Sequence, residues 1–189
     1  MVCALQLPSS AHASWFSVLP SEIPETPIDN WEPQSGDALI ADTETNIGYL
    51  IHSEGGFTSF PIATGQRKIV RYIGRTYNAA TPNRHWISLS KEIKDDRTTF
   101  GKDGVFFRLS YKDEGTSYGI HSHAAWEAML GHQMRYRSMG CIIVSPSVLD
   151  IVGETFSLNN DALQVVTVDG FDDDGINYVT LKSVLQYGV

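Results

Sequence analysis

The segment 118–146 gathers the side chains of this sequence that are best suited to nucleophilic chemistry. It holds three of the six histidines together with Cys141. A thiol with a pKa of about 8.5 is mostly protonated at neutral pH, so a catalytic cysteine needs a base or a positive charge nearby. His121 and His123 would share one face of a strand, and the loop that follows is long enough to bring Cys141 beside either ring. These residues predict a cysteine nucleophile with a histidine base.

The backbone just before the cysteine suits the same chemistry. Gly140 permits a close approach of the chain to a ligand. The successive N–H groups of Met139, Gly140 and Cys141 can form an oxyanion hole, because several N–H donors aimed at one point stabilise the oxygen of an attacked carbonyl. We therefore predict that this turn supports an acyl-transfer reaction.

Two other interpretations of the cysteine stay open. A free cysteine in an apolar run is often a small buried hydrophobe. A zinc site is the second alternative, because histidine and cysteine are common zinc ligands. Its ligands would be His121, His123, His132 and Cys141. The zinc interpretation leaves Ser138 and Gly140 without a role, so we expect no metal.

The elements that position this segment are mostly strands. Nine segments have the alternating or β-branched composition of strands, and glycine-rich or proline-containing turns separate several of them. They are 38–42, 47–52, 57–63, 68–73, 86–89, 105–111, 118–122, 162–168 and 176–184. The first three predict an antiparallel meander. The sequence as a whole predicts a mainly-β domain.

One or two short helices complete the expected fold. Trp126, Met129 and Leu130 recur at helical spacing within 124–134, which predicts a short helical insert beside the site. Ser145 and Pro146 are a favourable N-cap and first helical residue, and they predict a helix over 148–156. We expect no helix that spans a membrane.

Composition limits the domain organisation and the partners. A chain of 189 residues and 20.9 kDa suits one domain with its own core. Residues 1–36 are rich in proline and lack a sustained period, so we expect a tail or linker there and a folded domain over 37–189. The net charge of −8 argues against binding to nucleic acid or to anionic membranes. Two cysteines make no disulfide framework.

The order of the chemical residues resembles a known family. Ile120-His121 followed by Ser138-Met-Gly-Cys141 is similar to the signature of the L,D-transpeptidase catalytic domain (YkuD-like). Two upstream fragments, 61–65 and Thr81-Pro82, resemble further elements of that family. The resemblance spans about residues 37–170. It implies a β-sandwich of mostly antiparallel strands, and a reaction that needs no cofactor.

The resemblance also implies a role for each matching residue. Cys141 is the expected nucleophile and His121 its base, oriented by the carbonyl of Ser122, while Ser138 holds the cysteine loop. The implied substrate is a peptidoglycan stem peptide: the thiolate attacks an L,D amide, terminal D-alanine leaves, and the acyl group passes to an amine. With water as the acceptor, the same site would be an L,D-carboxypeptidase.

Three positions depart from the family pattern. Ser122 stands where glycine is frequent, Met139 where histidine is frequent, and Ile143 where arginine or asparagine is frequent. The last departure removes a polar group that could bind a substrate carboxylate. Together with the departure at Ser122, it motivates a second hypothesis, a cell-wall-binding domain that keeps the fold and has lost turnover.

Positive and titratable groups between the histidines and the cysteine are candidate substrate contacts. They are His123, His132, Arg135 and Arg137. The alternative is a solvated loop, since clustered charges on a flexible segment are common. Because the implied substrate lies outside the cytoplasm, we expect a periplasmic, extracellular or wall location. The sequence has the small residues of a signal-peptide end at 8–13 but no basic region before them.

Overall fold

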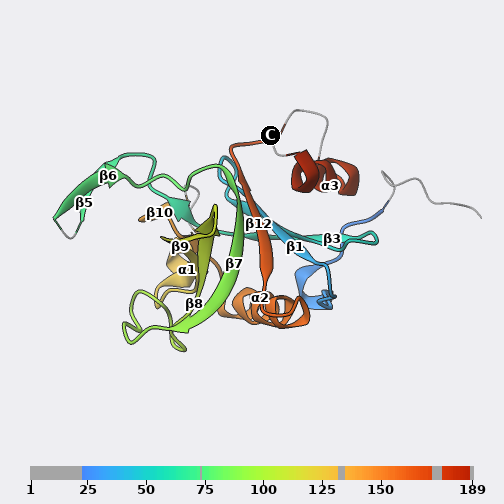
Figure 1. The fold of residues 1–189 in the computed structure, drawn as a ribbon, viewed down its shortest axis with the longest axis horizontal. Helices are drawn as coiled ribbons and strands as arrows, with labels where there is room; N and C mark the ends of the chain where they lie inside the picture. Colours follow the sequence, from blue (N-terminus) through green and yellow to red (C-terminus); the bar gives the residue numbers. More distant parts are fainter. Residues whose placement is uncertain (1–22, 73, 132–134, 172–175, 188–189) are drawn as a thin grey trace, which may run out of the picture.

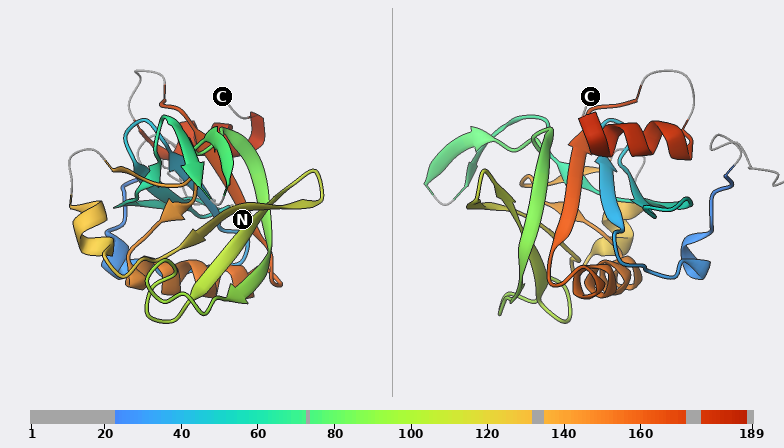
Figure 2. Two further views of the ribbon diagram at one scale, coloured as in Figure 1. Left: turned by 90° about the vertical axis from the view of Figure 1, so that its left-hand side faces the viewer. Right: turned by 45° about the vertical axis from the view of Figure 1, so that its right-hand side comes forward.

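The computed structural model describes residues 23–72, 74–131, 135–171 and 176–187. Its centre is a mixed eight-stranded sheet in the order β11-β9-β8-β7-β12-β1-β2-β3. The strands are β1 (Ala38–Asp42), β2 (Ile47–Ile51), β3 (Phe57–Pro61), β7 (Arg84–Ile93), β8 (Val105–Tyr111), β9 (Glu114–His121), β11 (Ile142–Ile143) and β12 (Leu163–Val168). Figures 1 and 2 show the sheet curling around one side of the molecule.

The mainly-β prediction is confirmed, but the expected sandwich is replaced by this single curled sheet. The strands β1, β2 and β3 do form the predicted antiparallel meander. However, β12 inserts between β1 and β7 and runs parallel to β1, and β11 runs parallel to β9. Helices, rather than a second large sheet, cover the faces.

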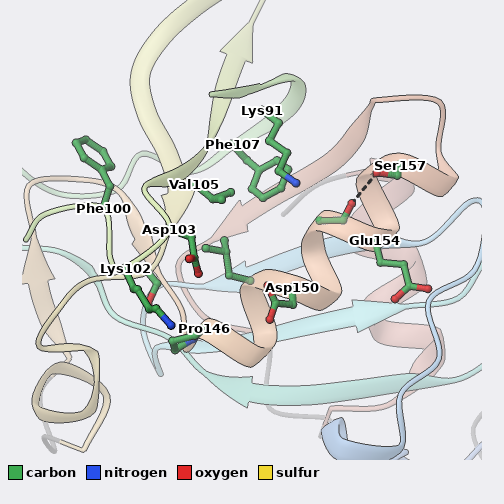
Figure 3. A pocket seen from close by; sticks show the side chains of 13 residues that line it. Lys91, Phe100, Lys102, Asp103, Val105, Phe107, Pro146, Asp150, Glu154 and Ser157 are labelled. Atoms are coloured by element: carbon green, nitrogen blue, oxygen red, sulfur yellow. Dashed lines mark hydrogen bonds between the residues drawn. The ribbon is translucent and has the colours of Figure 1, made fainter. Parts of the chain in front are cut away.

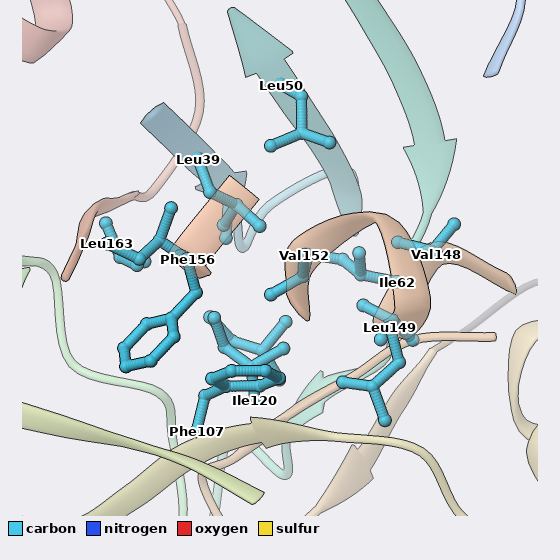
Figure 4. Packing of buried hydrophobic residues seen from close by; sticks show 14 of the residues in the cluster. Leu39, Leu50, Ile62, Phe107, Ile120, Val148, Leu149, Val152, Phe156 and Leu163 are labelled. Carbon is cyan, nitrogen blue, oxygen red and sulfur yellow. The ribbon is translucent and has the colours of Figure 1, made fainter. Parts of the chain in front are cut away.

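Two helices cover the opposite faces of the sheet. Helix α2 (Pro146–Leu158) packs Val152 and Phe156 against one face, where Phe156 lies 5.3 Å from Phe107 between ring centroids (Figure 4). Helix α3 (Tyr178–Tyr187) packs against the other face with Leu181 and Val184. Strand β1 is therefore buried on both sides, which explains its continuous apolar sequence.

Helix α2 begins as the sequence predicts. Ser145 is the N-cap, its Oγ accepts a hydrogen bond from the N–H of Val148 at 3.2 Å, and Pro146 opens the helix. The predicted insert helix is present as α1 (Trp126–Leu130). The end of the predicted insert, residues 132–134, lies outside the described residues.

The strand predicted over 176–184 is wrong, because this segment belongs to α3. Tyr178, Leu181 and Val184 are its buried residues, and they recur every three residues as on one face of a helix. The apolar, β-branched composition concealed that period. The described residues therefore contain three α-helices, one more than expected, and a short 3-10 helix, η2 (Ile28–Asn30).

Four short strands lie outside the main sheet and border the site. β4 (Thr64–Gly65) pairs in parallel with β10 (Tyr136–Ser138). β5 (Ile69–Tyr72) and β6 (Arg75–Asn78) form an antiparallel hairpin that projects from the body of the domain (Figure 1). Of β5 and β6, only β5 was predicted as a strand. We call residues 69–78 the arm.

The segment before residue 37 contacts the domain where the structure describes it. The N–H of Thr26 donates to the carbonyl of Phe57 at 2.8 Å, and Trp31 is buried and stacks on His52 with 3.8 Å between ring centroids. The boundary at residue 37 stays a prediction. No helix in the described part of the chain is long and apolar enough to span a membrane.

Candidate active site

His121, at the end of β9, and Cys141, just before β11, both line one cleft. His121 ends β9, and its register partner on the parallel strand β11 is Ile143. Cys141 precedes Ile143 by two residues, so it lies on the same face as His121. With strands about 4.8 Å apart and a rise of about 3.3 Å per residue, the two Cα atoms are on the order of 8 Å apart. Both side chains line a cleft of about 1010 Å³.

The imidazole of His121 is held in one orientation. Its Nδ1 lies 2.7 Å from the carbonyl oxygen of Ser122. Because a carbonyl can only accept, Nδ1 carries the hydrogen, and Nε2 of the neutral ring is left to accept a proton. The ring packs against both Phe100 and Phe106, at 4.9 and 5.8 Å between centroids, and these two rings also contact each other. This geometry is what a general base requires.

Burial sets the protonation of both groups. It lowers the pKa of His121 to about 4, against partial compensation from the carbonyls of Ser122 and Thr99. Burial also raises the pKa of Cys141 to about 11, against partial compensation from Gly119 and from the charge of Arg108. The thiol lies 3.8 Å from the carbonyl oxygen of Ser117. At neutral pH the pair therefore rests as an imidazole and a thiol.

The cysteine loop, residues 138–141, is fixed through its carbonyl groups. All four successive carbonyls accept a hydrogen bond. The donors are Gln66 N to Ser138 O at 2.9 Å, Tyr77 Oη to Met139 O at 3.4 Å, Thr81 Oγ1 to Gly140 O at 2.9 Å, and Ser138 Oγ to Cys141 O at 2.6 Å. Three of the four donors come from residues 66–81. The loop is thus anchored to the connection between β4 and β7.

The two upstream fragments that resemble the transpeptidase family meet beneath this loop. The N–H of Gly65 donates to Oγ1 of Thr81 at 2.9 Å, and the same hydroxyl donates to Gly140. A Cβ on Gly65 would lie 2.0 Å from the carbonyl oxygen of Ala79, so only glycine fits here. The hydroxyl of Thr81 therefore connects two segments of backbone.

Gly140 is required by both its conformation and its surroundings. Its φ of +118° is one that other residues rarely adopt, and a Cβ would lie 2.5 Å from the ring of Tyr118. Its N–H donates to Oγ of Ser138 at 3.0 Å. Of the three N–H groups predicted to form an oxyanion hole, that of Gly140 is thus already bonded within the loop.

Of the other residues predicted to contact the substrate, some line the cleft and others do not. His123 and Arg137 line the cleft, as does Met139, which is 40% exposed. His123 also accepts a hydrogen bond from the N–H of Ala125 at 2.9 Å, just before α1. The guanidinium of Arg135 instead donates to the carbonyl of Thr45, 3.2 Å away, and does not line the cleft. His132 lies outside the described residues.

Several cleft residues were not foreseen. Arg108 forms an ion pair with Glu92 at 2.5 Å, which with Lys94 lowers the pKa of Glu92 to about 2. Tyr118 supports Gly140, and Arg75 reaches the cleft from the arm. None of these belongs to a motif. Arg108 alternates with inward-facing apolar residues of β8, and this alternation could have predicted that its side chain lies on the opposite face of the strand from the core.

A second cavity of about 480 Å³ lies behind the histidine. Figure 3 shows lysine and acidic side chains around it, including Lys91, Asp103 and Asp150. Ser122 lines this cavity, and its buried Oγ has no hydrogen-bond partner among the described residues. Among all the residues that the structure describes, no group of three or more His, Cys, Asp or Glu side chains could hold a metal ion.

Comparisons with known proteins identify the fold. No protein-family model and no curated sequence matches the chain. Among solved structures, an L,D-transpeptidase fragment (residues 123–326) from Xylanimonas cellulosilytica is 16% identical with a TM-score of 0.53, covering 73% of this chain and 63% of that one.

Two further structures match over 82% of this chain. They are the protein Bd1075 of Bdellovibrio bacteriovorus, 13% identical with a TM-score of 0.51, and a K307A mutant of the helical cell shape determining protein Pgp2 of Campylobacter jejuni, 15% identical with a TM-score of 0.52. The matches span 56% and 54% of those chains. The chain therefore has the fold of L,D-transpeptidase catalytic domains.

Proposed function

We propose that this protein is a cysteine acyltransferase that acts on peptidoglycan stem peptides in the cell envelope. The observation that carries the proposal is the placement of His121, at the end of β9, and Cys141, just before the parallel strand β11, in one cleft. The orientation of His121 by the Ser122 carbonyl supports a base at Nε2. The fold supports the substrate class, because a solved L,D-transpeptidase shares it.

The reaction begins with two neutral groups. As the thiol attacks the carbonyl carbon of an L,D amide, its proton passes to Nε2 of His121, and a C–S bond forms while the carbonyl becomes an oxyanion. The imidazolium then gives its proton to the leaving amine of D-alanine, and the C–N bond breaks. The product is a thioester on Cys141 and a neutral His121.

The second half of the reaction regenerates the thiol. An acceptor amine attacks the thioester, His121 takes a proton from that amine, and the proton returns to sulfur as the C–S bond breaks. The volume of the cleft, about 1010 Å³, is at the upper end of ligand sites and leaves room for an acceptor beside the stem peptide. With water as the acceptor, the same steps would hydrolyse the thioester.

The oxyanion is stabilised by backbone N–H groups of the cysteine loop. Since the N–H of Gly140 is bonded to Ser138, we assign this role to the N–H groups of Cys141 and Met139. The anchored carbonyls of the loop hold these donors in place, so they need no reorganisation during the reaction.

Acylation tests this proposal directly. The protein is incubated with a tetrapeptide stem, or with a carbapenem, and its intact mass is recorded. We expect an adduct on the wild type and on Cys3→Ser, and none on Cys141→Ala. An adduct that persists in Cys141→Ala, or turnover of the stem without Cys141, contradicts the assignment. Stem binding without any adduct would favour a wall-binding domain.

A further inference from the structure

Charge is distributed unevenly along this acidic chain. Despite the net charge of −8, residues 55–91 contain no aspartate or glutamate. The same segment carries Arg67, Lys68, Arg71, Arg75, Arg84 and Lys91. The arm, residues 69–78, lies at its centre. A locally cationic projection on an acidic protein favours an anionic partner over a neutral one.

The arm is joined to the cysteine loop. Tyr77 on β6 donates its hydroxyl hydrogen to the carbonyl of Met139, and Gln66, before β5, donates to the carbonyl of Ser138. Tyr72 and Arg75 are register partners across the hairpin, and Arg75 alternates with Tyr77 along β6, so all three share a face. These three residues line the cleft that contains Cys141.

The cleft itself lacks acidic side chains. No aspartate or glutamate is among the described residues that line it, whereas Arg75, Lys94, Arg108 and Arg137 are. Lys94 and Arg108 share a single carboxylate, that of Glu92, so these three side chains together keep one net positive charge. In the described part of the chain neither Arg75 nor Arg137 forms an ion pair, and both are exposed. Arg75 and Arg137 are thus two cations in the lining of the cleft that have no ion-pair partner among the described residues.

Ile143 cannot supply a polar contact in their place. It is 2% exposed and packs in a small apolar cluster with Ala63 and Leu130. Any recognition of a carboxylate near Cys141 must therefore come from other elements. Guanidinium groups are suited to it, because they donate two parallel hydrogen bonds to one carboxylate.

We propose that the arm is a substrate-binding element, and that Arg75, together with Arg137, binds carboxylates of the stem peptide. This inference rests on the proposed function for the identity of the peptide. Its consequence is selectivity: the site prefers stems whose carboxylates are free to stems in which they are amidated. Tyr72 and Tyr77 flank Arg75 and provide the apolar and hydroxyl contacts along the peptide.

A binding experiment separates this inference from catalysis. On Cys141→Ala protein, which cannot be acylated through that sulfur, the dissociation constants of a fluorescent tetrapeptide stem and of its amidated counterpart are measured by polarisation. We expect the free stem to bind about tenfold more tightly. Arg75→Gln and Arg137→Gln should each weaken the free stem about tenfold and the amidated stem less than about twofold, since one charge-assisted contact is lost.

The matched control is Arg71→Gln, on the same arm but outside the cleft lining. It should leave both dissociation constants within about twofold. Equal binding of the two stems, no binding of either, or an equal effect of Arg71→Gln and Arg75→Gln overturns the inference. Acylation of the wild type is a separate readout: selective binding without acylation refutes only the proposed function, and acylation without selectivity refutes only the role of the arm.

Discussion

Replacing Thr81 with valine tests how the cysteine loop is held. Valine keeps the shape of threonine and removes the hydroxyl that accepts from Gly65 and donates to Gly140. Thr81 is 6% exposed, so water cannot easily replace either bond. Thr81→Ser is the matched control, because it keeps the hydroxyl and removes only a methyl group.

The two variants should differ in stability by an amount that the geometry sets. A buried donor or acceptor left without a partner costs about 1–3 kcal/mol. Thr81→Val leaves one of each, so we expect a loss of about 2–6 kcal/mol in the free energy of unfolding. Thr81→Ser loses about one methyl group of buried surface, or about 1 kcal/mol.

Urea unfolding, followed by tryptophan fluorescence, measures both values, and the rate of acylation measures the state of the loop. Thr81→Val should also acylate more slowly, because Gly140 loses its anchor next to the nucleophile. If Thr81→Val costs less than about 0.5 kcal/mol, or no more than Thr81→Ser, then the hydroxyl does not bridge the two segments and the reasoning is wrong.

Three further predictions concern pKa values and backbone strain. On a Cys3→Ser background, the rate of Cys141 alkylation by iodoacetamide should rise steadily with pH up to about 10, because the pKa of this thiol is raised to about 11. At pH 8 the rate should be about 100-fold lower than that of a free thiol. A plateau below pH 8 would indicate a preformed thiolate. Gly140→Ala should lower the free energy of unfolding by about 1–3 kcal/mol, because alanine is strained at this φ and its Cβ meets the ring of Tyr118. An unchanged midpoint of urea unfolding would contradict this. Glu92→Gln should destabilise the protein above about pH 4.5 and progressively less toward pH 2. The pKa of Glu92 is depressed in the folded state, so its contribution to stability disappears as the carboxylate is protonated. Thermal unfolding of both proteins across this pH range measures the difference, and a difference that does not change with pH would argue against the ion pair.

Local patterns were sufficient for elements that depend on neighbouring residues. Strand β8 has the predicted bounds because its aromatic and branched residues suit a half-buried sheet surface. Helix α2 was predictable because its N-cap and its proline act within one turn. The α3 segment was predicted as a strand because its apolar residues fit both a strand and a short amphipathic helix. Only packing against the sheet decides between the two.

Contacts between distant segments could not be read from the sequence. The parallel pairing of β12 with β1 places a late strand in the middle of the sheet, and no local signal encodes it. The same is true of Arg75, whose position in the cleft depends on the arm and on its bond to the cysteine loop. Residue types and strand alternation predicted that Cys141 lies near His121 or His123, and the family resemblance singled out His121 as the base. The catalytic roles of His121 and Cys141 stay predictions.

The anchoring of the cysteine loop has a consequence for the order of folding. Its bonds from Tyr77 and Thr81 join residues that are 62 and 59 positions apart in the chain. A single hydrogen bond does not offset the entropy of closing so large a loop, so these bonds form only once the sheet has brought the two segments together. In a chain whose sheet has formed but whose cysteine loop is not yet anchored, the thiol of Cys141 would be exposed to solvent and would have an ordinary pKa. Slow alkylation of Cys141 is therefore also a measure of completed folding, and reactive thiol in a refolding mixture would count the molecules that have not reached the last step.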